Sequence, residues 1–313
     1  MLDKNLVEKI IRISSLSAIA CYPHIGKGNK NLADKAATDE MRKNLNKLNI
    51  NGEIVIGEGE LDEAPMLYIG EKLGTGKGPS IDIAVDPVEG TNFVSNNLPG
   101  GLVVIAASKK GYLFKAPETY MEKLAVGKDI PYEAVDLDFS VEKNIKNISE
   151  SKNKPISNIT ACILDRPRHK KTINDLKKLG VNLKLITDGD VAGALLVSDK
   201  KYNVDIFLGI GGGPEGVLAA SALDAFGCKF QGRFLFKTEE DIRRAKEMGI
   251  DDLNKKYSLH EIIKGDSLFC ATGITSGELV SGVRQQNGKF YTETLVAQKG
   301  SIIDIVIQEE PST

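Results

Sequence analysis

Apolar runs and helical segments alternate along the chain from about residue 158, and this rhythm limits the architectures open to it. The apolar runs occupy residues 159–164, 181–186 and 204–208, and helical spacing follows in residues 171–179, 190–198 and 214–226. Alternation of strand and helix predicts a parallel sheet with covering helices, which is an α/β architecture. The chain has 313 residues and is long enough for a large core and two domains.

The first half of the chain is predicted to be α+β. Apolar residues recur at three- and four-residue spacing in residues 2–16 and 33–48, which predicts two amphipathic helices. Strands are predicted near residues 53–56, 81–86 and 102–108.

Composition also indicates where the chain turns and where its domains divide. The residues at 109–111 predict the turn of a hairpin. The polar stretch 143–154 predicts a boundary between an N-terminal α+β domain, 1–155, and a C-terminal α/β domain, 156–313. The segment after residue 265 is β-rich again, so its assignment to the second domain stays open, and residues 308–313 are predicted to fray.

Charge and cysteine content exclude several classes of protein. Lys and Arg number 41 against 43 Asp and Glu, which gives no electrostatic reason to expect nucleic acid or an anionic membrane as partner. The N-terminus is too charged for a signal peptide, and no apolar run approaches the ~18 residues of a membrane span. The four cysteines are widely spaced and are expected to be buried, reduced thiols. We therefore expect a soluble, cytoplasmic protein.

The segment 82–92 ends a predicted strand on carboxylates. Because side chains alternate along a strand, Asp86 is expected to leave the sheet pointing into a site, and Pro87 to end the strand. Glu89 and the hydroxyl of Thr91 follow within five residues. Carboxylate oxygens without His or Cys favour Mg²⁺ or Mn²⁺ over zinc. The same spacing also fits an ordinary Asp-Pro turn.

Two further acidic residues are candidates for such a site. Glu58 lies between Gly57 and Gly59, which would let the backbone approach another element closely, although four acids in six positions also fit a solvated loop. Asp34 borders the buried stripe of the second predicted helix, and a carboxylate there needs a partner.

Unusual residues follow each strand of the second half. The first loop, 165–169, has two arginines and His169, which is expected to donate to a bound phosphate. The second is the Asp-Gly-Asp at 188–190, and the third is the glycine-rich loop 209–216. Ligands of open α/β sheets bind outside the carboxyl ends of the strands. Arginines grip phosphates, aspartates accept from sugar hydroxyls, and glycine loops present N–H groups to anions. Together the loops indicate a sugar-phosphate site, whereas each alone also fits a solvated loop, a capping turn or a flexible connection. Tyr120 fits either a core position or a ligand contact.

Several of these motifs occur together, in order, over nearly the whole chain. They are the segments 30–34, 54–67, 82–91, 120–124, 167–169, 188–190 and 209–216. In this combination the chain closely resembles class II fructose-1,6-bisphosphatase, the bacterial GlpX type. The resemblance implies the layered α/β/α/β/α sandwich that this family shares with inositol monophosphatases.

The resemblance also implies particular site residues and a metal cofactor. It places metal-ligating carboxylates at Asp34 and Glu58 for one cation and at Asp86, Glu89 and Glu215 for another, with two or more Mn²⁺ or Mg²⁺ ions per site. The implied catalytic residues are Thr91, Asp86, Glu89 and Glu58. The implied substrate contacts are Glu89, Gly90, Thr91, Tyr120, Arg166, Pro167, Arg168, Asp188, Gly189, Asp190 and Gly212. Arg166 stands where the family often has Lys, and Asn29 where Asp is common.

The activity implied is metal-assisted hydrolysis of the 1-phosphate of fructose 1,6-bisphosphate, a gluconeogenic reaction. Thr91 would position the attacking water, and Arg166 and Arg168 would anchor the distal phosphate. Sedoheptulose 1,7-bisphosphate and inositol phosphate stay open as substrates, and a sugar-phosphate sensor without turnover is the alternative of another class. Relatives of this type form homodimers or homotetramers, so we expect a homo-oligomer.

Overall fold

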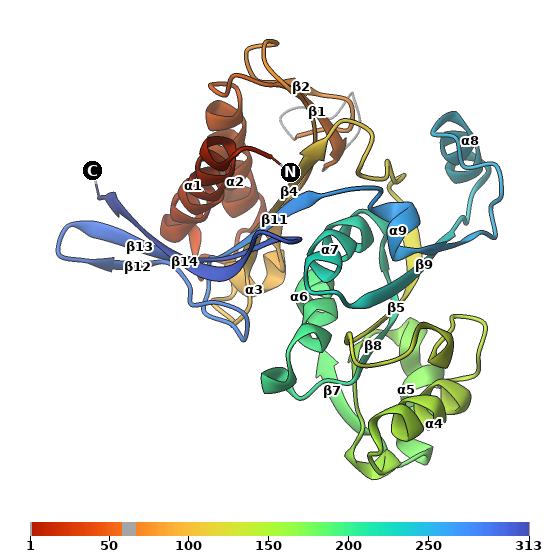
Figure 1. Ribbon diagram of the computed structural model, residues 1–313. Coiled ribbons are helices and arrows are strands. Elements are labelled where there is room, and N and C mark those ends of the chain that lie inside the picture. The colour runs from red at the N-terminus through yellow and green to blue at the C-terminus, as the bar shows by residue number, and fades with distance from the viewer. Residues whose placement is uncertain (1, 58–66, 313) are drawn as a thin grey trace. The chain divides into compact units, whose positions relative to one another are not determined.

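The computed structural model describes residues 2–57 and 67–312, which fold into two compact units, each with its own mixed sheet and covering helices (Figure 1). Unit 1 comprises Met1–Lys115 and Ile263–Thr313, and unit 2 comprises Ala116–Ile262. The predicted α/β class is confirmed. Within the described ranges, no helix combines the length and apolar character needed to span a bilayer. All four cysteines are buried thiols, as predicted.

Two helices cover one face of the sheet in unit 1. They are α1 (Lys4–Cys21) and α2 (Lys30–Leu45), and both match the helices predicted from spacing. Asp3 caps α1 by accepting from the Leu6 N–H, and Asn29 caps α2 by accepting from the Leu32 N–H. The apolar stripes of both helices bury against the strand face that carries Ile81, Ile83 and Val85.

The sheet of unit 1 runs in the order β12, β13, β11, β4, β3, β1, β2, with β14 on the other side of β13. β1 and β3 are parallel, and the remaining paired strands are antiparallel. A short helix, α3 (Thr91–Ser95), follows β3. The strands are β1 (Asn51–Ile56), β2 (Lys72–Leu73), β3 (Ser80–Glu89), β4 (Leu102–Lys109), β11 (Ser267–Gly273), β12 (Arg284–Gln286), β13 (Lys289–Gln298) and β14 (Ile302–Pro311).

The prediction that Pro87 ends its strand is wrong. β3 continues to Glu89, and its register against β4 shifts between Asp86, which pairs with Val104, and Glu89, which pairs with Leu102. A bulge tolerates proline because the extra residue is left out of the hydrogen-bonding ladder. The strand therefore bends where its carboxylates begin.

Two connections also differ from prediction. The predicted hairpin at 109–111 does not form, since Leu113 makes an isolated antiparallel bridge to Ile263 and the carboxylate of Asp82 accepts from the Gly111 N–H at 2.6 Å. The predicted frayed tail is strand β14 as far as Pro311, held by pairing with β13 and by a bidentate ion pair of Glu310 with Arg12.

Unit 2 has a sheet in the order β10, β9, β5, β8, β6, β7. β6 is parallel to both β7 and β8, as the alternating pattern predicts, while β5, β9 and β10 add antiparallel strands that the pattern did not reveal. The strands are β5 (Tyr120–Val126), β6 (Thr160–Leu164), β7 (Asn182–Ile186), β8 (Ile206–Gly212), β9 (Lys229–Leu235) and β10 (Lys256–Ser258). The helices are α4 (Val141–Lys152), α5 (Lys170–Lys178), α6 (Asp190–Leu195), α7 (Gly213–Ala225), α8 (Glu239–Glu247) and α9 (Leu259–Ile262).

The units divide at other positions than the predicted boundary between 155 and 156. The polar stretch 143–154 lies largely in α4, whose Ile145 and Ile148 are buried. Unit 2 begins at Ala116 because β5 pairs with β8 and β9, and unit 1 resumes at Ile263 because β11 pairs with β4.

Glu53 on β1 links stability to pH. Lys115 and Lys72 each donate to its carboxylate, at 2.5 and 2.7 Å, and hold the pKa of Glu53 at about 2. Because the pKa of Glu53 is lower in the folded state, its ion pairs stabilise the fold fully above the unfolded pKa, near 4.5. This stabilisation is lost as the pH falls toward 2. We expect Glu53→Gln to lose roughly 2 kcal/mol at pH 7 and much less at pH 3, measured by urea unfolding. An equal loss at both pH values would contradict this role for the ion pairs.

Candidate active site

The bend at the end of β3 presents two carboxylates and a hydroxyl. Asp86 Oδ1 accepts from the Val88 N–H at 3.1 Å, and the Thr91 hydroxyl donates to the Val88 carbonyl at 3.1 Å. Glu89 is buried, with 4% of its surface exposed. Gly90 caps α3 with a φ of +75°, a conformation that favours glycine. The predicted residues of this segment therefore form one corner of unit 1.

Asp34 lies on α2, which packs against β3 and α3. The side chain is partly buried, and its charge acts with burial to raise the pKa of the Cys21 thiol. Glu58, the other predicted ligand of the first cation, lies outside the described residues. Among the residues that are described, no three His, Cys, Asp or Glu side chains converge on a metal position. The predicted ligand set therefore stays a proposal.

In unit 2, the predicted loops follow β6, β7 and β8 and lie at one edge of the sheet, because β6 is parallel to both neighbours. The first two loops approach each other, since Arg166 Nη2 lies 3.8 Å from Asp188 Oδ1. Gly189 adopts a φ of +80° and caps α6, which begins at Asp190. This edge gathers the residues predicted to bind substrate in the second half.

Tyr120 begins β5 and is 38% exposed, so it is not a core residue. Two cations lie over its ring, the Arg168 guanidinium at 5.0 Å and the Lys237 ammonium at 4.4 Å from the centroid. Arg168 Nε also donates to the Ile210 carbonyl at 2.8 Å, which fixes the arginine against the third loop. Sequence reasoning missed Lys237, because it follows β9 and no local motif connects it with Tyr120. The arrangement provides a positively charged surface suited to a phosphate.

His169 is not a phosphate donor, contrary to expectation. Its ring is 2% exposed; Nδ1 lies 2.7 Å from the Leu164 carbonyl and Nε2 lies 2.7 Å from the Ile210 backbone nitrogen. An amide N–H can only donate, so Nε2 accepts and Nδ1 carries the proton. Burial lowers the pKa of His169, which keeps the ring neutral. The histidine therefore ties the loop after β6 to β8.

Lys123 is a functional candidate that sequence reasoning missed. It lies on β5 between Glu122 and Leu124, is 1% exposed, and forms an ion pair with Asp190 Oδ2. The second carboxylate oxygen of Asp190 is buried and has no hydrogen-bond partner within the described part of the chain. The available signal was a lysine on the same strand face as Met121 and Ala125, because an ammonium buried among apolar residues requires a counter-charge.

The glycines of the third loop make room for two carboxylates. A Cβ at Gly211 would lie 1.9 Å from Asp190 Oδ2, and one at Gly212 would lie 1.9 Å from Glu215 Oε2. Glu215 lies in the first turn of α7, and burial raises its pKa, while the nearby charge of Lys123 opposes the rise. The acidic candidates in both units offer oxygen donors only, which suits a hard divalent cation such as Mg²⁺ or Mn²⁺.

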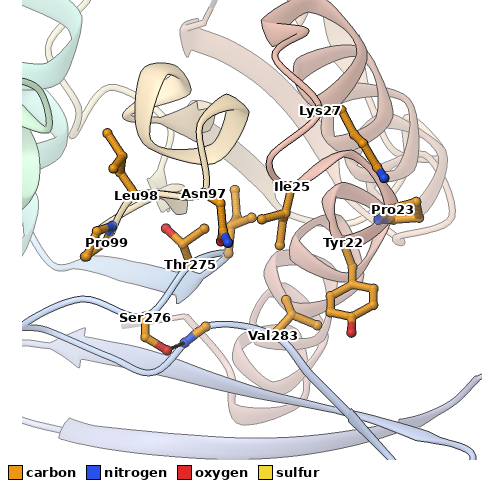
Figure 2. A pocket seen from close by; sticks show the side chains of 12 residues that line it. Tyr22, Pro23, Ile25, Lys27, Asn97, Leu98, Pro99, Thr275, Ser276 and Val283 are labelled. Carbon is orange, nitrogen blue, oxygen red and sulfur yellow. Dashed lines mark hydrogen bonds between the residues drawn. The ribbon is translucent and has the colours of Figure 1, made fainter.

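Unit 1 also has a hollow of about 650 Å³ that contains none of the predicted site residues (Figure 2). Two of its polar side chains already serve the backbone: Thr275 Oγ1 accepts from the Gly101 N–H at 2.8 Å, and Ser276 Oγ accepts from the Gly282 N–H at 2.9 Å. Nothing in this lining selects a ligand. The lining residues are Tyr22, Pro23, Ile25, Lys27, Asn97, Leu98, Pro99, Ile274, Thr275, Ser276, Gly282 and Val283.

Comparison with known proteins yields extensive matches. Residues 4–309 match the family described as bacterial fructose-1,6-bisphosphatase, glpX-encoded. Fructose-1,6-bisphosphatase 1 class 2 of Escherichia coli (strain K12) is 41% identical over 307 residues, covering 94% of this chain and 91% of that protein. The D-fructose 1,6-bisphosphatase class 2/sedoheptulose 1,7-bisphosphatase of Trichodesmium erythraeum is 40% identical over 325 residues, covering 96% and 94%.

Solved structures give a weaker likeness. The inositol monophosphatase of Anabaena (Nostoc) sp. PCC 7120 is 12% identical, with a TM-score of 0.32, over 62% of this chain and 71% of that chain. Values this low support no argument about function.

Proposed function

Because this chain belongs to the family of bacterial, glpX-encoded fructose-1,6-bisphosphatases, we propose that the carboxylate corner of unit 1 performs its chemistry and the strand ends of unit 2 bind its substrate. The enzyme is a class 2 fructose-1,6-bisphosphatase, a phosphatase that acts in gluconeogenesis. The main support for these residue roles is the corner at the end of β3. There Asp86, Glu89 and Thr91 follow one another within six residues of the chain. Family membership argues against a sensor without turnover.

The proposed cation ligands are all carboxylates. Asp34 and Glu58 would hold one divalent ion, and Asp86, Glu89 and Glu215 another, with Mn²⁺ or Mg²⁺ as the ion. When bound, such ions supply electrostatic stabilisation of the charge that develops on the phosphoryl group. We expect the protein to work in the cytoplasm as a homodimer or homotetramer.

Thr91 is the residue proposed to orient the attacking water. Its hydroxyl donates its hydrogen to the Val88 carbonyl, so the hydroxyl oxygen can still accept a hydrogen bond from a water. A water that donates to this oxygen has its lone pairs turned away from Thr91, toward an incoming phosphorus atom. The corner thus fixes the direction of attack without a covalent intermediate.

Replacing Thr91 with Val should lower kcat about 100-fold and change KM little, because the substitution keeps the shape and removes the acceptor. Thr91→Ser keeps the hydroxyl and is the matched control, expected to retain most of the activity. Release of inorganic phosphate from fructose 1,6-bisphosphate measures both. A Val variant as active as the Ser variant would remove Thr91 from the mechanism.

The distal phosphate is proposed to bind at the positive surface of unit 2. Arg168 and Lys237 lie over the Tyr120 ring, and Arg166 lies beside Asp188. Forked guanidinium donors orient a phosphate rather than react with it. Asp188 and Asp190 would accept hydrogen bonds from the sugar hydroxyls.

Sedoheptulose 1,7-bisphosphate is the second candidate substrate, because the Trichodesmium erythraeum relative carries that activity in its name. Phosphate release from fructose 1,6-bisphosphate, sedoheptulose 1,7-bisphosphate and inositol monophosphate, measured side by side, tests the assignment. The proposal expects release from the first, with or without the second. Preference for inositol monophosphate would contradict it.

A further inference from the structure

His169 lies beyond the paired part of two neighbouring strands in the unit 2 sheet. β6 pairs with β8 at the start of β8, through Ile206 and Phe207. Further along β8, Gly209 has a φ of +142°, which favours glycine, and a Cβ at this position would lie 3.1 Å from His169 Nε2. The absence of a side chain at Gly209 therefore makes room for the imidazole ring.

The ring of His169 connects the two strands by two hydrogen bonds in series. Nδ1 donates to the carbonyl of Leu164 at the end of β6, and Nε2 accepts from the N–H of Ile210 on β8, each at 2.7 Å. A neutral imidazole suits this place because one of its two nitrogens donates and the other accepts. A side-chain amide has its donor and its acceptor at the same end and does not span such a gap. The separation of the two strands is therefore set by the histidine.

The residue of β8 that donates to His169 also holds Arg168. The carbonyl of Ile210 accepts from Arg168 Nε at 2.8 Å, while its N–H donates to the histidine. Both backbone groups of Ile210 are thus bound by consecutive residues of one loop. A shift of Ile210 relative to this loop would move the guanidinium of Arg168, so the position of the arginine depends on the histidine.

Arg168 keeps two nitrogens available for a ligand. Its bond to Ile210 uses Nε, and its guanidinium carbon lies 5.0 Å from the centroid of the Tyr120 ring. Within the described part of the chain, Nη1 and Nη2 make no hydrogen bond or ion pair. Two parallel N–H donors of this kind bind a phosphate in a forked arrangement. The direction of the fork is fixed by the bond between Nε and the backbone of β8.

We propose that His169 is the positioning residue for Arg168: its Nε2 fixes the backbone of Ile210, which in turn holds the guanidinium that binds the distal phosphate of the substrate. This role rests on the proposed function, since it requires that Arg168 binds that phosphate. His169 itself is 2% exposed and does not touch the substrate. Its removal should therefore raise KM and leave kcat nearly unchanged.

Two amide substitutions separate the roles of the two ring nitrogens. His169→Asn places an amide nitrogen near the position of Nδ1 and loses the acceptor for Ile210, whereas His169→Gln places an amide oxygen near the position of Nε2 and keeps that acceptor. We expect KM for fructose 1,6-bisphosphate to rise about tenfold in the Asn variant and to stay within about threefold of wild type in the Gln variant. His260→Asn is the matched control, because the His260 side chain is 77% exposed. Equal KM values for the Asn and Gln variants at position 169 would overturn the proposal.

A double-mutant cycle tests whether the histidine acts through the arginine. Arg168→Met alone should raise KM by more than about tenfold, because it removes a charged donor. Adding His169→Asn to Arg168→Met should change KM less than about twofold further. Effects that multiply would overturn the positioning role. A wild-type KM in Arg168→Met would instead remove the phosphate site of the proposed function, and the role of His169 with it.

Nitrogen-15 NMR of the wild-type protein tests the same contact even if a variant at position 169 does not fold. The chain has three histidines, so His24→Gln and His260→Gln assign the His169 signals by elimination. Burial lowers the pKa of His169, and at pH 7 we expect a single neutral tautomer with the proton on Nδ1 and an accepting Nε2. A proton on Nε2, or a mixture of the two tautomers, would overturn the proposal, because Nε2 would then not accept from Ile210.

Discussion

An Asp86→Asn enzyme should release phosphate from fructose 1,6-bisphosphate at less than about a thousandth of the wild-type rate. The substitution keeps the size of the side chain and the acceptor that Oδ1 offers to the Val88 N–H. What it removes is the negative charge at the bulge of β3, where the proposal places a divalent cation. The thermal unfolding midpoint should therefore stay near the wild-type value while activity is lost.

Two companion variants sharpen the result. Glu89→Gln should behave as Asp86→Asn does, because both carboxylates are assigned to one cation. Asp39→Asn is the matched control on α2, where an exposed aspartate pairs with Lys35 and is expected to have no role in catalysis. Calorimetric titration with Mn²⁺ should show weaker binding to both site variants than to the control. Activity of Asp86→Asn within tenfold of wild type would remove this residue from the cation site.

Replacing Lys123 with Met should have the largest effect on stability. The ammonium is 1% exposed and pairs with Asp190, so its removal leaves a buried carboxylate without its counter-charge. Breaking one side of a buried ion pair costs about 3–5 kcal/mol. We expect a loss of that size in the free energy of unfolding, measured with urea, together with loss of activity.

A double substitution separates stability from catalysis at this pair. Lys123→Met with Asp190→Asn removes both charges and should recover much of the stability that the single variant loses. Activity should not return, because Asp190 is also assigned to substrate. A Lys123→Met protein within 1 kcal/mol of wild type would contradict the energetic role of the pair. Recovery of full activity in the double variant would contradict the assignment of Asp190.

Local patterns predicted the parts of this protein that depend on neighbouring residues. Alternation along β3 placed Ile81, Ile83 and Val85 in the core, although the strand continues past Pro87 to Glu89. The rhythm of strands and helices predicted that the loops after β6, β7 and β8 share one edge. These features need only periodicity and topology.

The residues that sequence reasoning missed depend on distant partners. Lys123 is 67 positions from Asp190, and His169 is 41 positions from the Ile210 amide that fixes its tautomer. The tail is ordered by Arg12, which lies 298 positions from Glu310. Such contacts follow from the packing together of elements that lie far apart in the chain, which local composition does not encode. The polar composition of residues 143–154 likewise led to the prediction of a domain boundary instead of helix α4. This helix packs against the core through few apolar residues.

The measurement that tests the central claim most directly is phosphate release by the wild-type protein from fructose 1,6-bisphosphate with EDTA, and again after excess Mn²⁺ or Mg²⁺. The account predicts one phosphate released for each fructose 6-phosphate formed, no release in EDTA, and recovery when the divalent ion is restored. Release that continues unchanged in EDTA, or no release from this substrate with either ion, would contradict it.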